Sequence, residues 1–136
     1  MNILFFEDNA QADILATKVL MDEYKDDVYL TDRYSDFMEW MEIEPGAESF
    51  KALFVDLNVP RISLPKELRS HQPGVLSGWV FINEWLIIKY PFLQPRIILY
   101  SAYLDLLGKN AKKYHELYKK DPLLIKHMRE IFNKIE

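Results

Sequence analysis

The sequence predicts one α/β domain in which helices cover both faces of a five-stranded parallel sheet, a three-layer α/β/α architecture. Short, wholly apolar runs recur along the 136 residues, and segments with helical spacing of apolar residues lie between them. Two of the apolar runs end directly in acidic residues, which indicates strands that are buried on both faces and have polar carboxyl ends. The length fits a single unit, so we assign residues 1–136 to one domain.

The first half of the chain predicts two strand-helix pairs. Ile3–Phe6 is an apolar run followed at once by charge, which is typical of a buried parallel strand. After Asn9, which suits an N-cap, apolar residues recur at helical spacing at Ala12, Leu15, Ala16, Val19 and Leu20. Val28–Leu30 then predicts a second strand, and Tyr34–Met41 predicts a second helix that ends before Pro45-Gly46.

The third pair lies in the middle of the chain. Ala52–Val55 repeats the pattern of the first strand, because this apolar run also ends in a carboxylate, Asp56. A helix is expected after Ser77-Gly78, and Pro91 and Pro95 mark its exit. Its apolar positions would face the sheet: Phe81, Ile82, Trp85, Leu86 and Ile88.

The last third of the chain completes the alternation. Ile97–Tyr100 predicts a fourth buried strand that ends at Ser101. Leu104–Tyr118 is expected to be a mixed, lysine-rich helix, and Leu123–Ile125 a fifth strand that ends at Lys126. A short helix would close the domain.

Composition excludes several classes of protein. With 17 basic and 21 acidic residues the net charge is -4, which disfavours direct binding of nucleic acid. There is no cysteine, so neither a disulfide framework nor a thiolate metal site can form. The N-terminal residues do not have the pattern of a signal peptide, and the most apolar stretch, Trp79–Leu93, is too short to span a bilayer. A cytoplasmic protein that does not contact membranes is expected.

The carboxyl ends of parallel strands meet at one edge of a sheet, where ligands of such folds bind. The sequence places Glu7, Asp8, Asp56, Ser101 and Lys126 there. Clustered carboxylates repel one another unless a hard divalent cation such as Mg²⁺ neutralises them. A lysine and a serine hydroxyl suit the oxygens of a phosphoryl group, and Asp56 is the natural nucleophile.

The motifs at these strand ends resemble the receiver domain of two-component response regulators. They are EDN at 7–9, DLNVP at 56–60, SA at 101–102 and LLIKH at 123–127, and the likeness covers nearly the whole chain. The resemblance implies the flavodoxin-like (βα)5 fold. It also implies partners: a histidine kinase or phosphotransfer protein as donor, a downstream protein, and a phosphorylation-dependent dimer as one form of output.

The resemblance assigns a role to each residue of the site. Asp56 would accept the phosphoryl group, and the protein would catalyse its own metal-dependent phosphotransfer and dephosphorylation. Asp8 and Asp56 would ligate Mg²⁺ (or Mn²⁺) directly, Glu7 partly through water, and Asn58 through its main-chain carbonyl. Ser101 and Lys126 would bind the phosphoryl oxygens.

The sequence departs from the family pattern at three places, which bear on the roles that the resemblance implies. An extended loop at about 60–77 separates the third strand from its helix, where the family has a very short connection. His127 replaces the proline that usually follows the lysine through a cis bond, so a trans bond is expected and the reach of Lys126 is in doubt. Leu123 stands where many receivers carry a switching aromatic residue.

Other interpretations stay open at this point. Taken singly, Glu7-Asp8 and Asp56 fit solvated turns, and Lys126 fits a surface cation. The departures favour a receiver-like adaptor that binds a protein partner without phosphorylation. A Mg²⁺-dependent phosphohydrolase on a related fold is less favoured, because neither Asp8 nor Asp56 is followed two residues later by a second aspartate.

Overall fold

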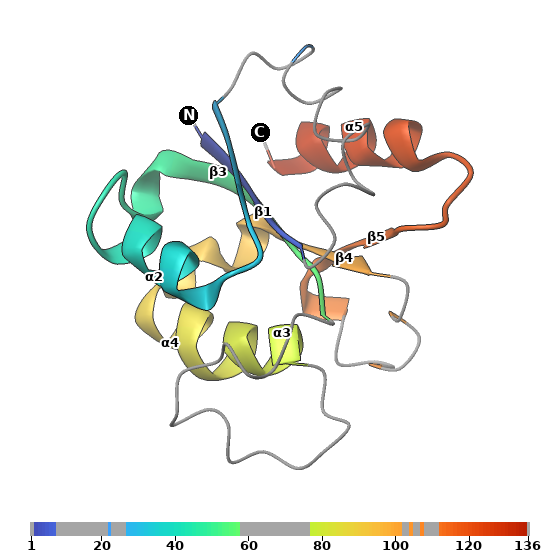
Figure 1. Ribbon diagram of the computed structural model, residues 1–136. Coiled ribbons are helices and arrows are strands. Elements are labelled where there is room, and N and C mark those ends of the chain that lie inside the picture. Colours follow the sequence, from blue (N-terminus) through green and yellow to red (C-terminus); the bar gives the residue numbers. More distant parts are fainter. Residues whose placement is uncertain are drawn as a thin grey trace.

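The computed structural model describes residues 2–7, 22, 27–57, 77–101, 104, 107 and 112–135. Five parallel strands form one sheet in the order β2-β1-β3-β4-β5 (Figure 1). The strands are β1 (Asn2–Phe6), β2 (Asp27–Thr31), β3 (Phe50–Val55), β4 (Ile97–Ser101) and β5 (His115–Tyr118). The predicted five-stranded parallel sheet is therefore confirmed.

Helices lie on both faces of this sheet. One face carries α2 (Tyr34–Glu42) and a helical segment made of α3 (Ser77–Phe81), a π-helical turn (Ile82–Leu86) and α4 (Ile87–Lys89). The other face carries α5 (Leu124–Ile135) (Figure 1). Two short 3₁₀ helices, Ala47–Ser49 and Pro91–Arg96, lead into β3 and β4. The helix expected around residues 12–20 lies outside the described residues.

Successive side chains of each strand point to opposite faces of the sheet, so the core has two layers, one on each face. In β1, Leu4 and Phe6 pack toward α2 and α3, whereas Ile3 and Phe5 pack toward α5. All four side chains are fully buried, as the wholly apolar run predicts. Burying a side chain of this size contributes about 1.5–3 kcal/mol, so the central strands hold both helix layers to the sheet.

Aromatic side chains join α2 and α3 beneath the carboxyl edge of the sheet. The ring of Phe6 lies 4.6 Å from that of Tyr34 and 5.1 Å from that of Phe37, in edge-to-face arrangements. Phe81 of α3 contacts both, at centroid distances of 4.8 Å from Tyr34 and 5.0 Å from Phe37. Such pairs add to simple burial, so the beginning of α2 and the end of α3 are held close to the end of β1.

The prediction for the fifth strand is wrong. Strand β5 is His115–Tyr118, within the range expected to be helical, and the predicted strand Leu123–Ile125 instead runs into α5. Strand β5 is an edge strand with only Leu117 fully buried, so it lacks the continuous apolar run of the central strands. A short apolar run such as 123–125 fits a buried strand and a helix equally well.

The residues before α5 do contain a helix-start pattern that predicts where this helix begins. Asp121 accepts a hydrogen bond from the Leu123 N–H at 2.8 Å and precedes Pro122, the arrangement of an N-cap with proline in the first helical turn. Apolar residues then recur at helical spacing: Leu124, Met128, Ile131, Phe132 and Ile135. In the part of the chain that the structure describes, no helix combines the length and apolarity that crossing a membrane requires.

Candidate functional site

Glu7 and Asp56 lie side by side at the carboxyl edge of the sheet. Each follows the last residue of its strand, and the backbone ladder continues to both: the Asp56 N–H donates to the Phe6 carbonyl at 2.8 Å and the Glu7 N–H to Thr31 at 3.1 Å. The strand register thus fixes where both side chains begin. Glu7 is 0% exposed and Asp56 is 3% exposed, so two carboxylates are buried next to each other.

Lys119, the residue after β5, supplies positive charge to this pair. Its ammonium group donates a hydrogen bond to Asp56 Oδ2 at 2.9 Å and forms an ion pair with Glu7 Oε2. The Lys119 backbone N–H donates to the Ser101 carbonyl at 3.1 Å, which holds its main chain beside the end of β4. The ammonium also lies 5.4 Å from the ring centre of Tyr100, in a cation–π contact.

The electrostatics of this triad are strongly coupled. Burial by itself lowers the pKa of Lys119, but hydrogen bonds to Glu7 and Asp56 outweigh this effect and raise the pKa above its ordinary value. With both carboxylates ionised, one ammonium leaves the triad with a net charge of about -1.

Ser101 and Gly78 border the triad. Ser101 is fully buried at the end of β4. Gly78, in the first turn of α3, donates its N–H to the Leu57 carbonyl at 2.9 Å. A Cβ on Gly78 would lie 2.0 Å from the Asp56 carbonyl oxygen, so only glycine allows α3 to approach the main chain of Asp56 this closely.

Tyr34 lies below the site, at the start of α2. Its side chain is fully buried, and burial together with the negative charge of Asp56 raises the pKa of the phenol well above its ordinary value. Tyr34 therefore stays neutral, and its hydroxyl remains a potential hydrogen-bond donor near the acidic pair.

The structure brings together three of the predicted site residues, Glu7, Asp56 and Ser101. Asp8 and Asn58 lie outside the described residues, as does the extended loop predicted at about 60–77, except for Ser77, which begins α3. Lys126 does not follow the fifth strand: it is exposed on α5, and Lys119 occupies the strand-end position instead. The missed signal is a lysine directly after a short, half-polar strand and two residues before Asp121-Pro122.

Two of the departures from the family pattern were positions counted relative to Lys126. If Lys119 takes the place of that lysine, both positions change. Lys120 now takes the place of the family's proline, and Glu116 takes the place of its aromatic residue. Among the described residues the cis peptide bond is Glu44-Pro45, so the bond after Lys119 is trans. Lys119 nevertheless reaches Asp56, with a hydrogen bond of 2.9 Å.

The donor set is compatible with a hard divalent cation. Within the described ranges no group of three or more Asp, Glu, His or Cys side chains could hold a metal ion, because Glu7 and Asp56 supply only two. Both offer carboxylate oxygens, the ligands that Mg²⁺ prefers, and the Lys119 ammonium shows that a cation is accommodated between them. The residues present therefore fit such an ion, as part of a larger ligand set.

Comparison with solved structures identifies the fold. The chain is similar to a CheY-like response regulator receiver domain from Methylobacillus flagellatus, with 21% identity and a TM-score of 0.57, over 100% of this chain and 98% of that one. It is also similar to the signal receiver domain of a putative Luxo repressor protein from Vibrio parahaemolyticus, with 17% identity and a TM-score of 0.63, over 98% and 91%.

A sensor protein from Polaromonas sp. JS666 shows the same likeness, with 19% identity and a TM-score of 0.56, over 99% of this chain and 98% of that one. No family model and no curated protein matches the sequence. The similarity to solved structures covers the whole length and agrees with the observed strand order. The chain therefore has the flavodoxin-like fold of response-regulator receiver domains.

Proposed function

We propose that this chain is a receiver module of two-component signal transduction and that Asp56 accepts a phosphoryl group from a histidine kinase or a phosphotransfer protein. The observation that carries the proposal is the buried triad at the carboxyl edge, in which the Lys119 ammonium contacts both Asp56 and Glu7. An acidic pair alone would fit a solvated turn. Full burial with a shared lysine fits a site built for a highly charged group.

In the proposed phosphotransfer, Asp56, Lys119 and Ser101 have different roles. A carboxylate oxygen of Asp56 forms a bond to phosphorus while the bond from phosphorus to the donor histidine nitrogen breaks, and the nitrogen leaves with its electron pair. The product is an acyl phosphate that carries more negative charge than the carboxylate it replaces. Lys119 would then donate to a phosphoryl oxygen, and the Ser101 hydroxyl, from the neighbouring strand, would donate to another.

A divalent cation completes this proposal. Asp8, Asp56, Glu7 and the main-chain carbonyl of Asn58 would hold Mg²⁺ or Mn²⁺, as the family resemblance implies. The bound ion would neutralise the charge that develops on the phosphoryl oxygens. Glu7 and Asp56 contribute buried oxygen ligands, and Lys119 balances the remaining negative charge.

The proposal extends to the signalling context. The module would catalyse its own phosphotransfer and dephosphorylation, and the added charge would bias a surface toward a downstream protein or a second copy of the chain. A cytoplasmic location fits this role. Neither nucleic acid nor membrane is part of the proposed interactions.

Acetyl phosphate, a small phosphodonor, tests the proposal directly. The protein is incubated with Mg²⁺ and acetyl phosphate, and the phosphorylated fraction is measured on a phosphate-affinity gel and by intact mass. We expect one phosphoryl group on the wild-type chain and none on Asp56→Asn. Removal of Mg²⁺ with a chelator should lower the labelling rate by at least about tenfold, because the charge on the phosphoryl oxygens is then unbalanced. Labelling that persists in Asp56→Asn would refute Asp56 as the acceptor.

The two lysines give a matched comparison in the same assay. Lys119→Met should lower labelling by about 10²-fold, the size of effect seen when one charge-stabilising donor is lost from a reaction site. Lys126→Met, on the exposed side of α5, should label like wild type. The reverse order would return the phosphoryl-binding role to Lys126. An absence of labelling in every form would favour the phosphorylation-independent adaptor.

A further inference from the structure

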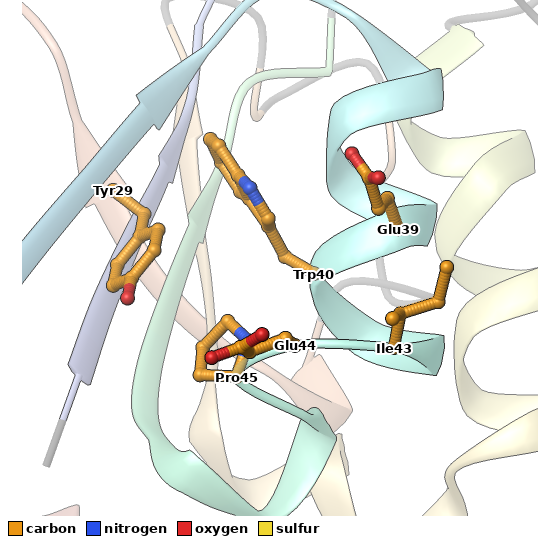
Figure 2. Close-up of a pocket in the computed structure, with 6 residues that line it drawn as sticks. All are labelled: Tyr29, Glu39, Trp40, Ile43, Glu44 and Pro45. Carbon is orange, nitrogen blue, oxygen red and sulfur yellow. The ribbon is translucent and has the colours of Figure 1, made fainter.

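A second site lies on the α2 face of the sheet, away from Asp56. Six residues line a pocket of about 410 Å³: Tyr29, Glu39, Trp40, Ile43, Glu44 and Pro45 (Figure 2). Tyr29 comes from the edge strand β2, and the others come from the second half of α2 and the turn after it. The volume is at the lower end of the range for ligand sites, which suits one large side chain or a small molecule.

The aromatic wall of this pocket is held in place. The rings of Tyr29 and Trp40 meet edge to face at 5.1 Å, and Tyr29 also contacts Phe50, the first residue of β3, at 5.4 Å. The Gly46 N–H donates to the Trp40 carbonyl at 2.8 Å, which ties the turn carrying Pro45 back to the helix. Figure 2 shows the Trp40 indole extending from α2 toward Tyr29, with Pro45 next to it.

The charge of the pocket is negative. Glu39 and Glu44 are both exposed, and in the described part of the chain neither carboxylate has an ion pair or a hydrogen bond. The nearby Glu42, in contrast, is paired with Lys89. Helix α2 has no basic residue in its last turn, so these carboxylates face the negative end of the helix dipole as well.

We propose that this pocket binds an arginine side chain in a basic segment of a protein partner. The flat guanidinium group stacks on the Trp40 indole, and its N–H donors reach the Glu39 or Glu44 carboxylate. The aliphatic stem of the arginine covers Ile43, whose side chain is 74% exposed, one of the largest values among the apolar residues described. Arginine fits better than lysine because its planar fork serves both the aromatic and the carboxylate contacts.

The pocket is independent of the proposed phosphotransfer site. Helix α2 begins with Tyr34, below Asp56, and runs away from that edge, so the pocket at its end adjoins the amino end of β3. None of its lining residues belongs to the Glu7–Asp56–Lys119 triad. Binding at the pocket therefore does not require phosphorylation, and either proposal can fail without the other.

The test uses the full chain and the tripeptide acetyl-Arg-Arg-Arg-amide. Binding is followed by NMR through the indole N–H signals of the three tryptophans, with the Trp40 signal assigned from a Trp40→Phe variant. We expect a saturable shift of the Trp40 signal, with a dissociation constant on the order of 1 mM, and little change at Trp79 or Trp85. A tri-lysine peptide should bind about threefold more weakly, and a tri-glutamate peptide should not bind.

Charge variants provide the matched comparison. Glu39→Gln and Glu44→Gln should each weaken binding of the arginine peptide by about threefold to tenfold. Glu130→Gln removes the same charge from the exposed face of α5 and should change binding by less than about twofold. Equal effects of all three variants, equal shifts of all three indole signals, or binding of the glutamate peptide would overturn the proposal.

Discussion

At the carboxyl edge of the sheet, the single ammonium group of Lys119 contacts two buried carboxylates, Glu7 and Asp56. Lys119→Met would remove the ammonium group that contacts both buried carboxylates, Glu7 and Asp56. We expect a loss of about 3 kcal/mol in the free energy of unfolding at pH 7, measured by urea denaturation. Mg²⁺ should restore more stability to this variant than to wild type, because it replaces the missing positive charge.

Lys120→Met and Lys126→Met are the controls, since both lysines are exposed. Each should change stability by less than about 0.5 kcal/mol. Because the folded-state pKa of Lys119 is raised, its contribution is fully present below its ordinary value of 10.5 and is lost as the pH rises through the raised value. The difference between wild type and Lys119→Met should therefore shrink only at strongly alkaline pH. A Lys119→Met protein as stable as its controls would contradict the triad.

At the scale of elements, the junction between β5 and α5 depends on Asp121. Hydrogen bonds from His127 and from the Leu123 N–H hold the pKa of Asp121 below its ordinary value of 3.8. A lowered folded-state pKa means that the contribution of Asp121 is present above pH 3.8 and is lost as the pH falls through the lowered value. Asp121→Ala should thus lower the thermal midpoint at pH 5, and by less toward pH 3.

Thermal unfolding followed by circular dichroism between pH 3 and 7 measures this difference. Asp22→Ala, at an exposed position remote in sequence from α5, serves as the comparison and should not reproduce the pH dependence. A deficit in Asp121→Ala that stays the same down to pH 3 would show that the carboxylate does not cap α5.

The elements also show which parts of the fold the sequence could predict. Ile3–Phe6 and Ala52–Val55 were predictable because central strands are buried on both faces, so local composition alone identifies them. Strand β5 was not, because an edge strand has a half-polar composition and forms only through its pairing with β4, a long-range contact. Lys126 was expected at a strand end only because the fifth strand was predicted at Leu123–Ile125, which lies at the start of α5 in the structure. Glu7 and Asp56 come directly after central strands and Ser101 ends one, so the burial of these strands brings all three to the same edge.

At the scale of the whole molecule, the two proposed sites lie at opposite ends of α2. The triad occupies the carboxyl edge, and the acidic pocket occupies the other end of the helix. Tyr34 packs on Phe6 and Phe81 at one end of α2, and Trp40 packs on Tyr29 at the other. Because the same rigid helix carries both contacts, a partner held at the pocket would approach the receiver from a defined side.

The connection between β3 and α3 offers a test of how far the domain depends on its longest insertion. Leu57 and Gly78, which lie on either side of residues 59–76 in the sequence, are close together, because the Leu57 carbonyl accepts a hydrogen bond from the Gly78 N–H at 2.9 Å. Replacing 59–76 by a linker of about four glycine and serine residues should therefore keep the fold. Shortening the connection lowers the entropic cost of closing the loop by about 1.3 kcal/mol, so we expect the free energy of unfolding to stay within about 1.5 kcal/mol of wild type in urea denaturation. Asn58 stays in the shortened chain, so Asp56 should still be labelled by acetyl phosphate. A variant that folds but is not labelled would show that the insertion takes part in phosphotransfer, whereas a variant that does not fold would show that the core depends on it.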